Sequence, residues 1–228
     1  MFDFSVIVQN MPLLLQGLWL TVFFTVTSLL LGAAIGIVVA ICRVCPIKPL
    51  KVLSLIYIEG VRGTPLLVLL FILYYALPQL GVKLSATTAG ILGLGINAGA
   101  YIAEIFRAGI EAVPVGQVEA ARSVGMSYGQ TMRKIILPQA STLVLPPLTN
   151  EAISQVKATS LISTIAIAEL LRTGQQIISM TFAAVEIYAA VALMYLAFNL
   201  TLGWLARRLE KRQSRGRRRI GQVNEAGV

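Results

Sequence analysis

The stretch EAARSVGMSYGQTMRKIILP, residues 119–138, interrupts an otherwise apolar sequence and limits where membrane helices can run. It carries charges of both signs, contains two glycines and ends in a proline. A helix that crosses a bilayer core needs about 20 mostly apolar residues, so this stretch is too hydrophilic to cross. It is also too long for a simple turn. We therefore predict a polar helical module between two membrane helices.

The composition of the whole chain is that of an integral membrane protein. Of its 228 residues, 57% are hydrophobic and 13% are charged, and the mean hydropathy is +0.80. Soluble domains are closer to half apolar and a quarter charged. The N-terminal residues lack the basic flank of a cleavable signal peptide, so we expect the first apolar stretch to remain as a membrane helix.

Five apolar stretches are long enough to cross the bilayer as helices. They cover residues 13–41, 52–77, 86–110, 135–156 and 185–205. The fourth is the least regular, because Pro146 and Pro147 interrupt it and Glu151 follows. Residues 161–182 are apolar but rich in polar side chains, which favours a short helix and loop at the membrane surface. The predicted fold is all-α, with five transmembrane helices.

Basic residues predict the orientation of these helices, since cytoplasmic loops are enriched in Lys and Arg. Five spans place the three basic regions of the chain on one side of the membrane. These regions hold Arg43, Lys48 and Lys51; Arg122, Arg133 and Lys134; and Arg207, Arg208, Lys211, Arg212, Arg215, Arg217, Arg218 and Arg219. The N-terminus is then outside and the C-terminus inside. We expect the basic tail to lie on anionic headgroups and to have no role with nucleic acid.

The sequence offers little for catalysis or metal binding. It contains no His, and Cys42 and Cys45 are too few for a zinc site, which usually needs four ligands. A CxxC pair alone is a weak redox signal, so two unpaired thiols at a helix end are expected. No nucleophile and base stand out as a pair. We therefore predict no enzyme activity, no metal and no cofactor.

Polar residues within the predicted spans are candidates for binding a substrate, because a charge at the centre of a membrane helix costs about 2.5–3.5 kcal/mol. Helical spacing groups them by face. They are Asn97, Tyr101 and Glu104 on the third span, Glu151 and Gln155 on the fourth, and Arg62 near the start of the second. Together they would surround a small zwitterion, with a cation for its carboxylate and an acid for its ammonium. The prolines of the fourth span would free backbone carbonyls nearby.

A purely structural interpretation competes for some of these residues. Glu104, Arg107 and Glu111 have the i,i+3 and i,i+4 spacing of ion pairs along one helix, and we favour that interpretation for these three. Arg62 has Glu59 as a potential partner near the cytoplasmic boundary. Asn97 and Glu151 have no obvious local partner, so we keep them as candidate ligands.

The polar module itself has a helical pattern. Residues 119–122 are strong helix formers, and Gly125 ends that helix. Ser127 is suited to cap a second short helix that runs through Arg133. Pro138 then stands in the first turn of the next span, where proline is tolerated. Two short cytoplasmic helices joined at a bend would suit docking into a groove on a soluble partner.

This pattern resembles the EAA motif of ABC importer permeases: E-A-A, three residues, Gly, nine residues, then I-x-L-P. The matching positions are Glu119, Ala120, Ala121, Gly125, Ile135, Leu137 and Pro138. Further segments resemble the polar amino-acid uptake subfamily. They are RGTPLL at 62–67, NAGAYIAEIFRAGIEAVPVGQVEAA at 97–121, LPPLTNE at 145–151 and KATSLIS at 157–163. The resemblance covers about residues 12–207.

The resemblance implies a permease subunit that moves a polar amino acid across the bacterial cytoplasmic (inner) membrane into the cell. Its implied partners are two ATP-binding cassette subunits, a second permease subunit of the same or a related chain, and an extracytoplasmic amino-acid-binding protein. Glu119 would anchor the ATPase contact, Gly125 would permit the turn, and Pro138 would set the entry of the fourth span. The chain has no Walker A signature, so ATP hydrolysis is expected in the partner.

The same resemblance divides the chain into three parts. Residues 1–11 form an extracytoplasmic segment, residues 12–207 form a type-1 transmembrane domain, and residues 208–228 form a basic cytoplasmic tail. The coupling helices cover about residues 113–134.

One position departs from relatives that take basic amino acids, which often have Asp after the Lys of K-x-T/S-S-L. This chain has Ala158 there. We therefore predict a polar neutral or acidic substrate, with Glu151 holding its ammonium.

The main alternative is an ion-gradient-driven secondary amino-acid transporter. It would need its own ion site and commonly shows internal repeats, which we do not find. A membrane scaffold is a second alternative, but a scaffold would need neither the polar face nor the module.

Overall fold

A computed structural model describes the backbone of residues 3–225 and the side chains of residues 3–208 and 210. All regular structure in this range is helical, which confirms the all-α prediction. The α-helices are α1 (Phe4–Val44), α2 (Lys48–Arg62), α3 (Leu66–Phe71), α4 (Ala86–Glu111), α5 (Val115–Ser123), α6 (Tyr128–Thr131), α7 (Leu137–Ala158), α8 (Leu170–Thr181) and α9 (Ala184–Glu225). The remaining turns are π-helical in η1 (Ile72–Ala76) and η3 (Met132–Ile136), and 3-10 in η2 (Leu77–Leu80) and η4 (Thr159–Ile165).

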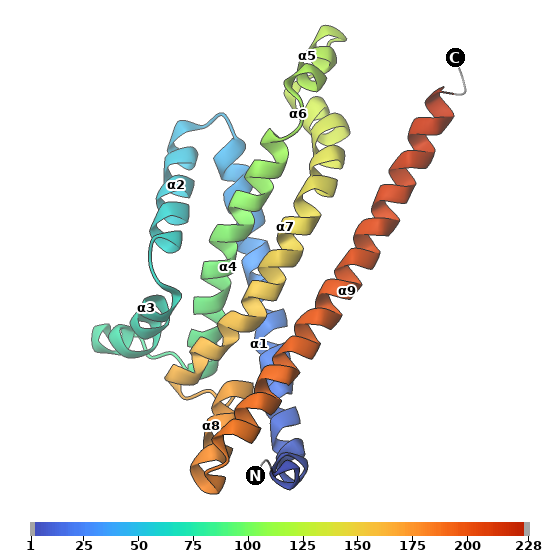
Figure 1. Cartoon of the computed structure of the whole chain (residues 1–228). Helices are drawn as coiled ribbons and strands as arrows, with labels where there is room; N and C mark the ends of the chain where they lie inside the picture. Colours follow the sequence, from blue (N-terminus) through green and yellow to red (C-terminus); the bar gives the residue numbers. More distant parts are fainter. Residues whose placement is uncertain (1–2, 226–228) are drawn as a thin grey trace.

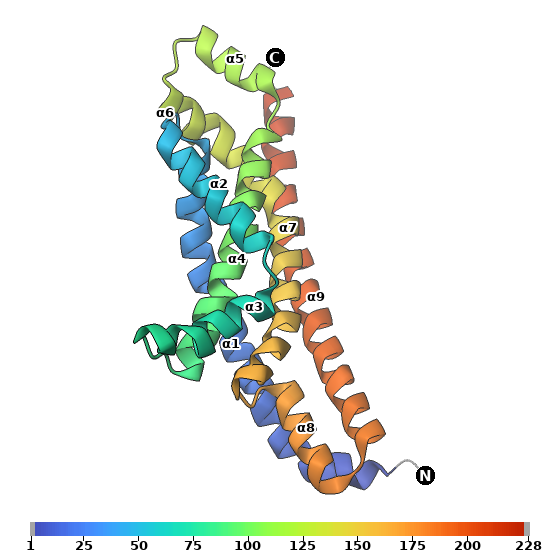
Figure 2. The ribbon, with the colours of Figure 1, turned by 90° about the vertical axis from the view of Figure 1, so that its left-hand side faces the viewer.

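The long helices α1, α4, α7 and α9 run along an elongated bundle, in which α1 and α4 form the most extensive pair (Figure 1). The short helices α5 and α6 lie at one end, and α8 lies with the N-terminus at the other (Figure 2). In the described part of the chain, three helices are long and apolar enough to cross a membrane: α1, α4 and residues Ala184–Arg208 of α9. A fourth is added if α2 and the arm that follows it are counted as one bent span.

The second predicted span, residues 52–77, is not one straight helix. It breaks after α2, and the segment Leu66–Leu80 leaves at 100° to it (Figure 2). The break falls at Gly63, Thr64 and Pro65. A residue before proline is pushed out of the helical region by the proline ring, and proline itself readily starts a new helix. The apolar run therefore folds as two arms.

The second coupling helix does not stop at Arg133 as the sequence predicted. It continues through η3 into α7, and the amide N–H of Leu137 donates to the carbonyl of Met132, five residues earlier. Pro138 follows at once, and a proline inside an ordinary α-helix clashes with the carbonyl four residues before it. The wider π-turn gives that carbonyl room. The same device, η1, precedes Pro78.

Other boundaries also differ from the predicted ones. Helix α1 begins at Phe4, so residues 4–11 are helical and continuous with the first apolar stretch. Helix α7 runs unbroken through Pro146 and Pro147. Helix α9 extends to Glu225, well past the apolar stretch. The predicted contact of the basic tail with headgroups depends on side chains that, from residue 211 onward, lie outside the described residues.

Residues 161–182 fold as predicted into a turn and a short helix, α8. Their buried apolar residues join two cores. Ile162 and Ile165 pack with Phe24, Leu70 and Leu94 in the middle of the bundle. Leu170 and Ile177 of α8 pack against α1 and α9. The segment thereby closes the end of the bundle opposite the module.

Candidate functional site

The module projects from the end of the bundle as α5 followed by α6 (Figure 2). Val118 anchors α5 against a small core of Val113, Ile136 and Ala140. Glu119, by contrast, is exposed and makes no hydrogen bond or ion pair with another described residue. An unpaired acid on an outward face is available to a partner.

A glycine forms the bend after α5, as predicted. Gly125 has a φ of 79°, a left-handed conformation that glycine adopts without steric cost. Its N–H donates to the carbonyl of Arg122 at 2.9 Å, and the N–H of Met126 donates to Ala121 at 3.0 Å. These two bonds make a Schellman motif, which satisfies the last carbonyls of the helix.

Ser127 caps the next helix, also as predicted. Its hydroxyl accepts from the backbone N–H of Gln130 at 3.3 Å, and the Gln130 side chain accepts from the N–H of Ser127 at 2.9 Å. This reciprocal pair is a capping box, which fixes the direction of the chain into α6. The bend is therefore held from both sides.

We expect Gly125→Ala to destabilise the bend by about 1 kcal/mol, because a side chain raises the energy of a left-handed residue. Space is not the cause, since a Cβ at Gly125 would meet nothing within 4 Å. Gly129→Ala is the matched control: its surroundings are equally open and its φ is not positive. Thermal unfolding of the two purified variants measures the difference. Equal melting temperatures would contradict the assigned role of Gly125.

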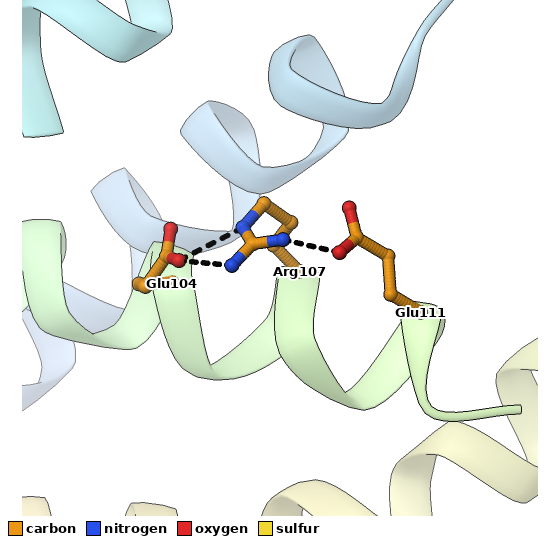
Figure 3. Close-up of polar contacts among 3 residues, drawn as sticks. All are labelled: Glu104, Arg107 and Glu111. Carbon is orange, nitrogen blue, oxygen red and sulfur yellow. Dashed lines mark hydrogen bonds and ion pairs between the residues drawn. The ribbon is translucent and has the colours of Figure 1, made fainter.

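The acidic and basic residues of α4 pair with one another. Arg107 donates through Nε to Glu104 at 2.9 Å, and its two terminal nitrogens contact Glu104 and Glu111 (Figure 3). The prediction of ion pairs along one helix face is confirmed. These are the only two ion pairs among the described side chains.

Arg62 does not pair with Glu59, contrary to the proposed pairing. Its guanidinium carbon lies 5.2 Å from the ring centroid of Tyr101, a cation–π distance. The reason is the chain direction: α2 ends at Arg62, and its side chain reaches across to α4 instead of back along α2. Arg62 and Tyr101, two predicted site residues, are thereby brought together.

These residues line a groove of about 430 Å³ between α4 and α7. Arg62, Tyr101 and Glu104 supply its polar groups, and Leu143 and Pro147 of α7 form part of its apolar wall. Such a groove can hold a small polar molecule, with the Arg62 guanidinium facing it and a Glu104 carboxylate that is shared with Arg107.

Gln155, by contrast, is part of the packing. Its side chain is 1% exposed, and Nε2 donates to Ser28 Oγ at 2.8 Å and to the carbonyl of Leu94 at 3.1 Å. These bonds tie α7 to α1 and to α4. Asn97 and Glu151 are partly exposed, make no hydrogen bond or ion pair with another described residue, and do not line the groove.

The family described as binding-protein-dependent transport system inner membrane component matches residues 32–215. This chain belongs to that family. The prediction of an importer permease of the bacterial inner membrane that is not itself an ATPase is thereby confirmed.

Named relatives of this permease agree with the family. The glutamine transport system permease protein GlnP of Escherichia coli K12 is 40% identical over 213 residues, 92% of this chain and 97% of that protein. The arginine transport system permease protein ArtQ of Bacillus subtilis is 33% identical over 211 residues, 92% of this chain and 96% of that protein. These matches confirm the prediction of an amino-acid importer permease.

Solved structures support the fold of the permease. A crystal structure of an amino acid ABC transporter with histidines superimposes with a TM-score of 0.89 at 42% identity, covering 93% of this chain and 99% of that one. An inward-facing MetNI methionine ABC transporter superimposes with a TM-score of 0.75 at 21% identity, covering 90% and 98%, and shows the shared fold alone.

The permease also contains a buried acid that the sequence analysis did not select. Glu169 is fully buried and caps α8, accepting from the N–H groups of Leu171 at 3.0 Å and Arg172 at 2.8 Å. The hydroxyl of Tyr195 on α9 donates to it at 2.7 Å. Burial raises the pKa of Glu169, and these hydrogen bonds oppose the shift. In the sequence, Glu169 is a single acid within an apolar stretch. That pattern indicates a buried acid but does not predict which residues bind it.

Proposed function

We propose that this permease carries a polar amino acid in a complex with two ATP-binding cassette subunits, a second permease subunit and an extracytoplasmic binding protein. The observation that carries the proposal is the exposed module, in which Glu119 and Ala120 face away from the bundle. The Schellman and capping-box hydrogen bonds around Gly125 hold α5 and α6 in a fixed relative orientation. A fixed orientation supports the role of the module, because a movement of the ATPase reaches the bundle only if the module does not bend. The positions expected to contact or orient the ATPase are Glu119, Ala120, Ala121, Gly125, Leu137 and Pro138.

The proposed topology has five spans, with the N-terminus outside and the C-terminus inside. The spans are α1, the bent α2–α3 arm, α4, α7 and α9. Helix α7 is more polar than the others, but its 22 residues reach about 33 Å at 1.5 Å per residue, enough for the hydrocarbon core. The basic α1–α2 connection lies at the same end as the module (Figure 2), which supports placing both in the cytoplasm. Residues 12–207 would form the transmembrane domain and residues 208–228 the tail.

The proposed substrate site uses the groove beside α4. Arg62, held over Tyr101, would bind the substrate carboxylate. Glu151 and Asn97 would meet the ammonium and polar side chain once a second permease subunit completes the path. Gln155 has no place in this site because its amide already bridges three helices.

The amino acid is proposed to be polar and neutral or acidic. Two of the named relatives are a glutamine and an arginine permease, so the relatives leave both chemistries open. This chain has Ala158 where relatives that take basic amino acids often have Asp, so it lacks an acid that could bind a second cationic group on the substrate. Glutamine-like substrates, which carry one cation, are therefore favoured over arginine.

We expect Glu151→Gln to weaken uptake of the substrate about tenfold or more, because a charged hydrogen bond contributes about 1.5–3 kcal/mol. Glu59→Gln is the matched control, since Glu59 is an exposed acid outside the proposed site. Uptake of labelled glutamine into proteoliposomes, competed with a panel of unlabelled amino acids, gives both the affinity and the preference. If arginine is the best competitor, the neutral or acidic assignment is wrong.

Co-purification tests the function as a whole. The tagged permease would be isolated from its native membranes in mild detergent, and its companions identified by mass spectrometry. An ATP-binding subunit is expected, and a second, different permease would establish a heterodimer. No ATPase in several detergents, together with uptake that follows an ion gradient, would favour the secondary transporter instead.

A further inference from the structure

An apolar groove of about 390 Å³ lies beside the module and has no assigned role. The end of α1 contributes Ile37 and Ile41, and α4 contributes Phe106. The opposite wall is formed by residues 128–137, the part of the module from α6 to the start of α7, which we call the coupling segment. It contributes Tyr128, Met132 and Leu137. Ile41, Tyr128 and Leu137 are about half exposed or more, so the chain itself leaves the groove open.

Apolar walls select an apolar occupant, because a cavity without polar partners holds water poorly. A groove of about 390 Å³ lies at the small end of the roughly 300–1,000 Å³ of sites that hold small molecules. It suits an alkyl chain better than a second helix. A lipid acyl chain is the apolar molecule that a membrane protein always meets.

Basic residues flank the connection that borders the groove. Two groove residues, Cys45 and Pro46, belong to the α1–α2 connection, which Arg43 precedes and Lys48 and Lys51 follow. None of these three cations forms an ion pair with a described acid. Arg43 interacts electrostatically with Glu104, yet its Nε is buried without a hydrogen-bond partner.

The start of α2 adds further donors. Its N-cap, Ile47, provides no side-chain hydrogen bond, and Pro49 in the first turn has no N–H, so the N–H groups of Lys48 and Leu50 are the ones left to bind an anion. Helix N-termini favour phosphate for this reason. A phosphate bound here would lie between the connection, which contributes two groove residues, and the start of α2, which carries both lysines.

We propose that this groove binds an anionic glycerophospholipid of the inner leaflet, with its phosphate at the α1–α2 connection and an acyl chain against the coupling segment. The proposal rests on the proposed orientation, which places this end of the bundle at the cytoplasmic surface. Because one wall is the coupling segment, a bound lipid would brace α6 and η3 against α1. Lipid composition would then modulate the coupling of ATP hydrolysis to transport.

The test uses the permease purified with its ATP-binding subunit, in nanodiscs that contain phosphatidylglycerol with a photoactivatable acyl chain. We expect light-induced adducts on peptides covering residues 37–46 and 128–137. Each lysine near an anionic group strengthens binding about fivefold, so K48Q/K51Q should reduce these adducts by at least about that factor. Lys83→Gln is the matched control, because Lys83 is exposed and lies before α4 at the other end.

A second variant, Ile41→Trp, fills the groove without changing its charge and should reduce the acyl adducts while leaving the lysines in place. Adducts of equal yield in all variants would overturn the lipid site. So would a crosslink from Cys45 to a neighbouring subunit in the assembled importer, since that subunit would then occupy the groove. The amount of ATP-binding subunit retained in the same samples tests the proposed importer function independently. A failure of the lipid site can therefore be distinguished from a failure of the proposed function.

Discussion

Uptake by a Glu119→Arg variant is expected to fall at least about thirtyfold, while the permease still inserts and folds at its normal level. Glu119 is exposed and unpaired among the described residues, so reversing its charge alters no internal contact. Surface substitutions of this kind usually change stability by about 0.5 kcal/mol or less. A charge pair buried on binding a partner is different, because disrupting it costs about 2–5 kcal/mol, or thirtyfold and more in affinity.

The measurement compares uptake in proteoliposomes with the amount of ATP-binding subunit that co-purifies. Glu119→Gln, which removes the charge without reversing it, should lie between the wild type and Glu119→Arg. Gln117→Arg also places an arginine on α5 but keeps Glu119. If uptake falls only in Glu119→Arg, the loss comes from the contact that Glu119 makes and not from added positive charge on α5. Full uptake by Glu119→Arg would refute the coupling role of this residue.

Features that depend on neighbouring residues were predictable from the sequence. The helix end at Gly125 follows from one residue type, and the Ser127 cap and the ion pairs of Arg107 follow from spacings of three or four residues. The physical causes act within one helical turn, so one stretch of sequence contains them. The helical fold class followed in the same way from long apolar runs.

The positions where helices break were predicted less accurately, although the prolines that determine them are visible in the sequence. The apolar run 52–77 looks continuous to hydropathy, which does not register the conformational limits of Thr64 and Pro65. Pro138 does stand in the first turn of α7, as predicted, but no break precedes it, because the π-turn η3 joins α6 to α7. Whether a proline breaks or widens a helix depends on what packs around it. Here Ile136, within η3, packs in the small core beneath α5.

Partners distant in sequence were out of reach. Gln155 faces a predicted polar side of α7, but its actual partner, Ser28, lies 127 residues away on α1. Glu169 likewise finds Tyr195 on another helix. Spacing along one helix shows which residues share a face and leaves open what that face meets. For this reason the sequence could not separate a substrate ligand from a packing residue.

The second large effect is expected where α1 crosses α4. Gly32→Leu should prevent these helices from packing, at a cost of about 3 kcal/mol or more. A Cβ at Gly32 would lie 2.8 Å from the Cβ of Ala98 and 3.1 Å from both the carbonyl oxygen of Gly95 and the nitrogen of Gly99. Two of these atoms are backbone and the third is a short side chain, so none can move aside. Fluorescence-detected size exclusion after heating should show an aggregated or sharply less stable permease.

Two controls determine whether close approach is the cause. Gly60→Leu on α2 adds the same bulk where a Cβ meets nothing within 4 Å, and it should be nearly neutral. Gly93→Ala should be milder than Gly32→Ala, because its nearest atom, 2.6 Å away, is the end of the flexible Leu70 side chain, and the next atoms lie at 3.4 Å. Since lipid tails are as apolar as leucine, burial of apolar surface contributes little to association within the bilayer, and close backbone contact must supply the attraction. If the Gly32→Leu permease is as stable as Gly60→Leu, the close contact of α1 and α4 at Gly32 does not hold the bundle together.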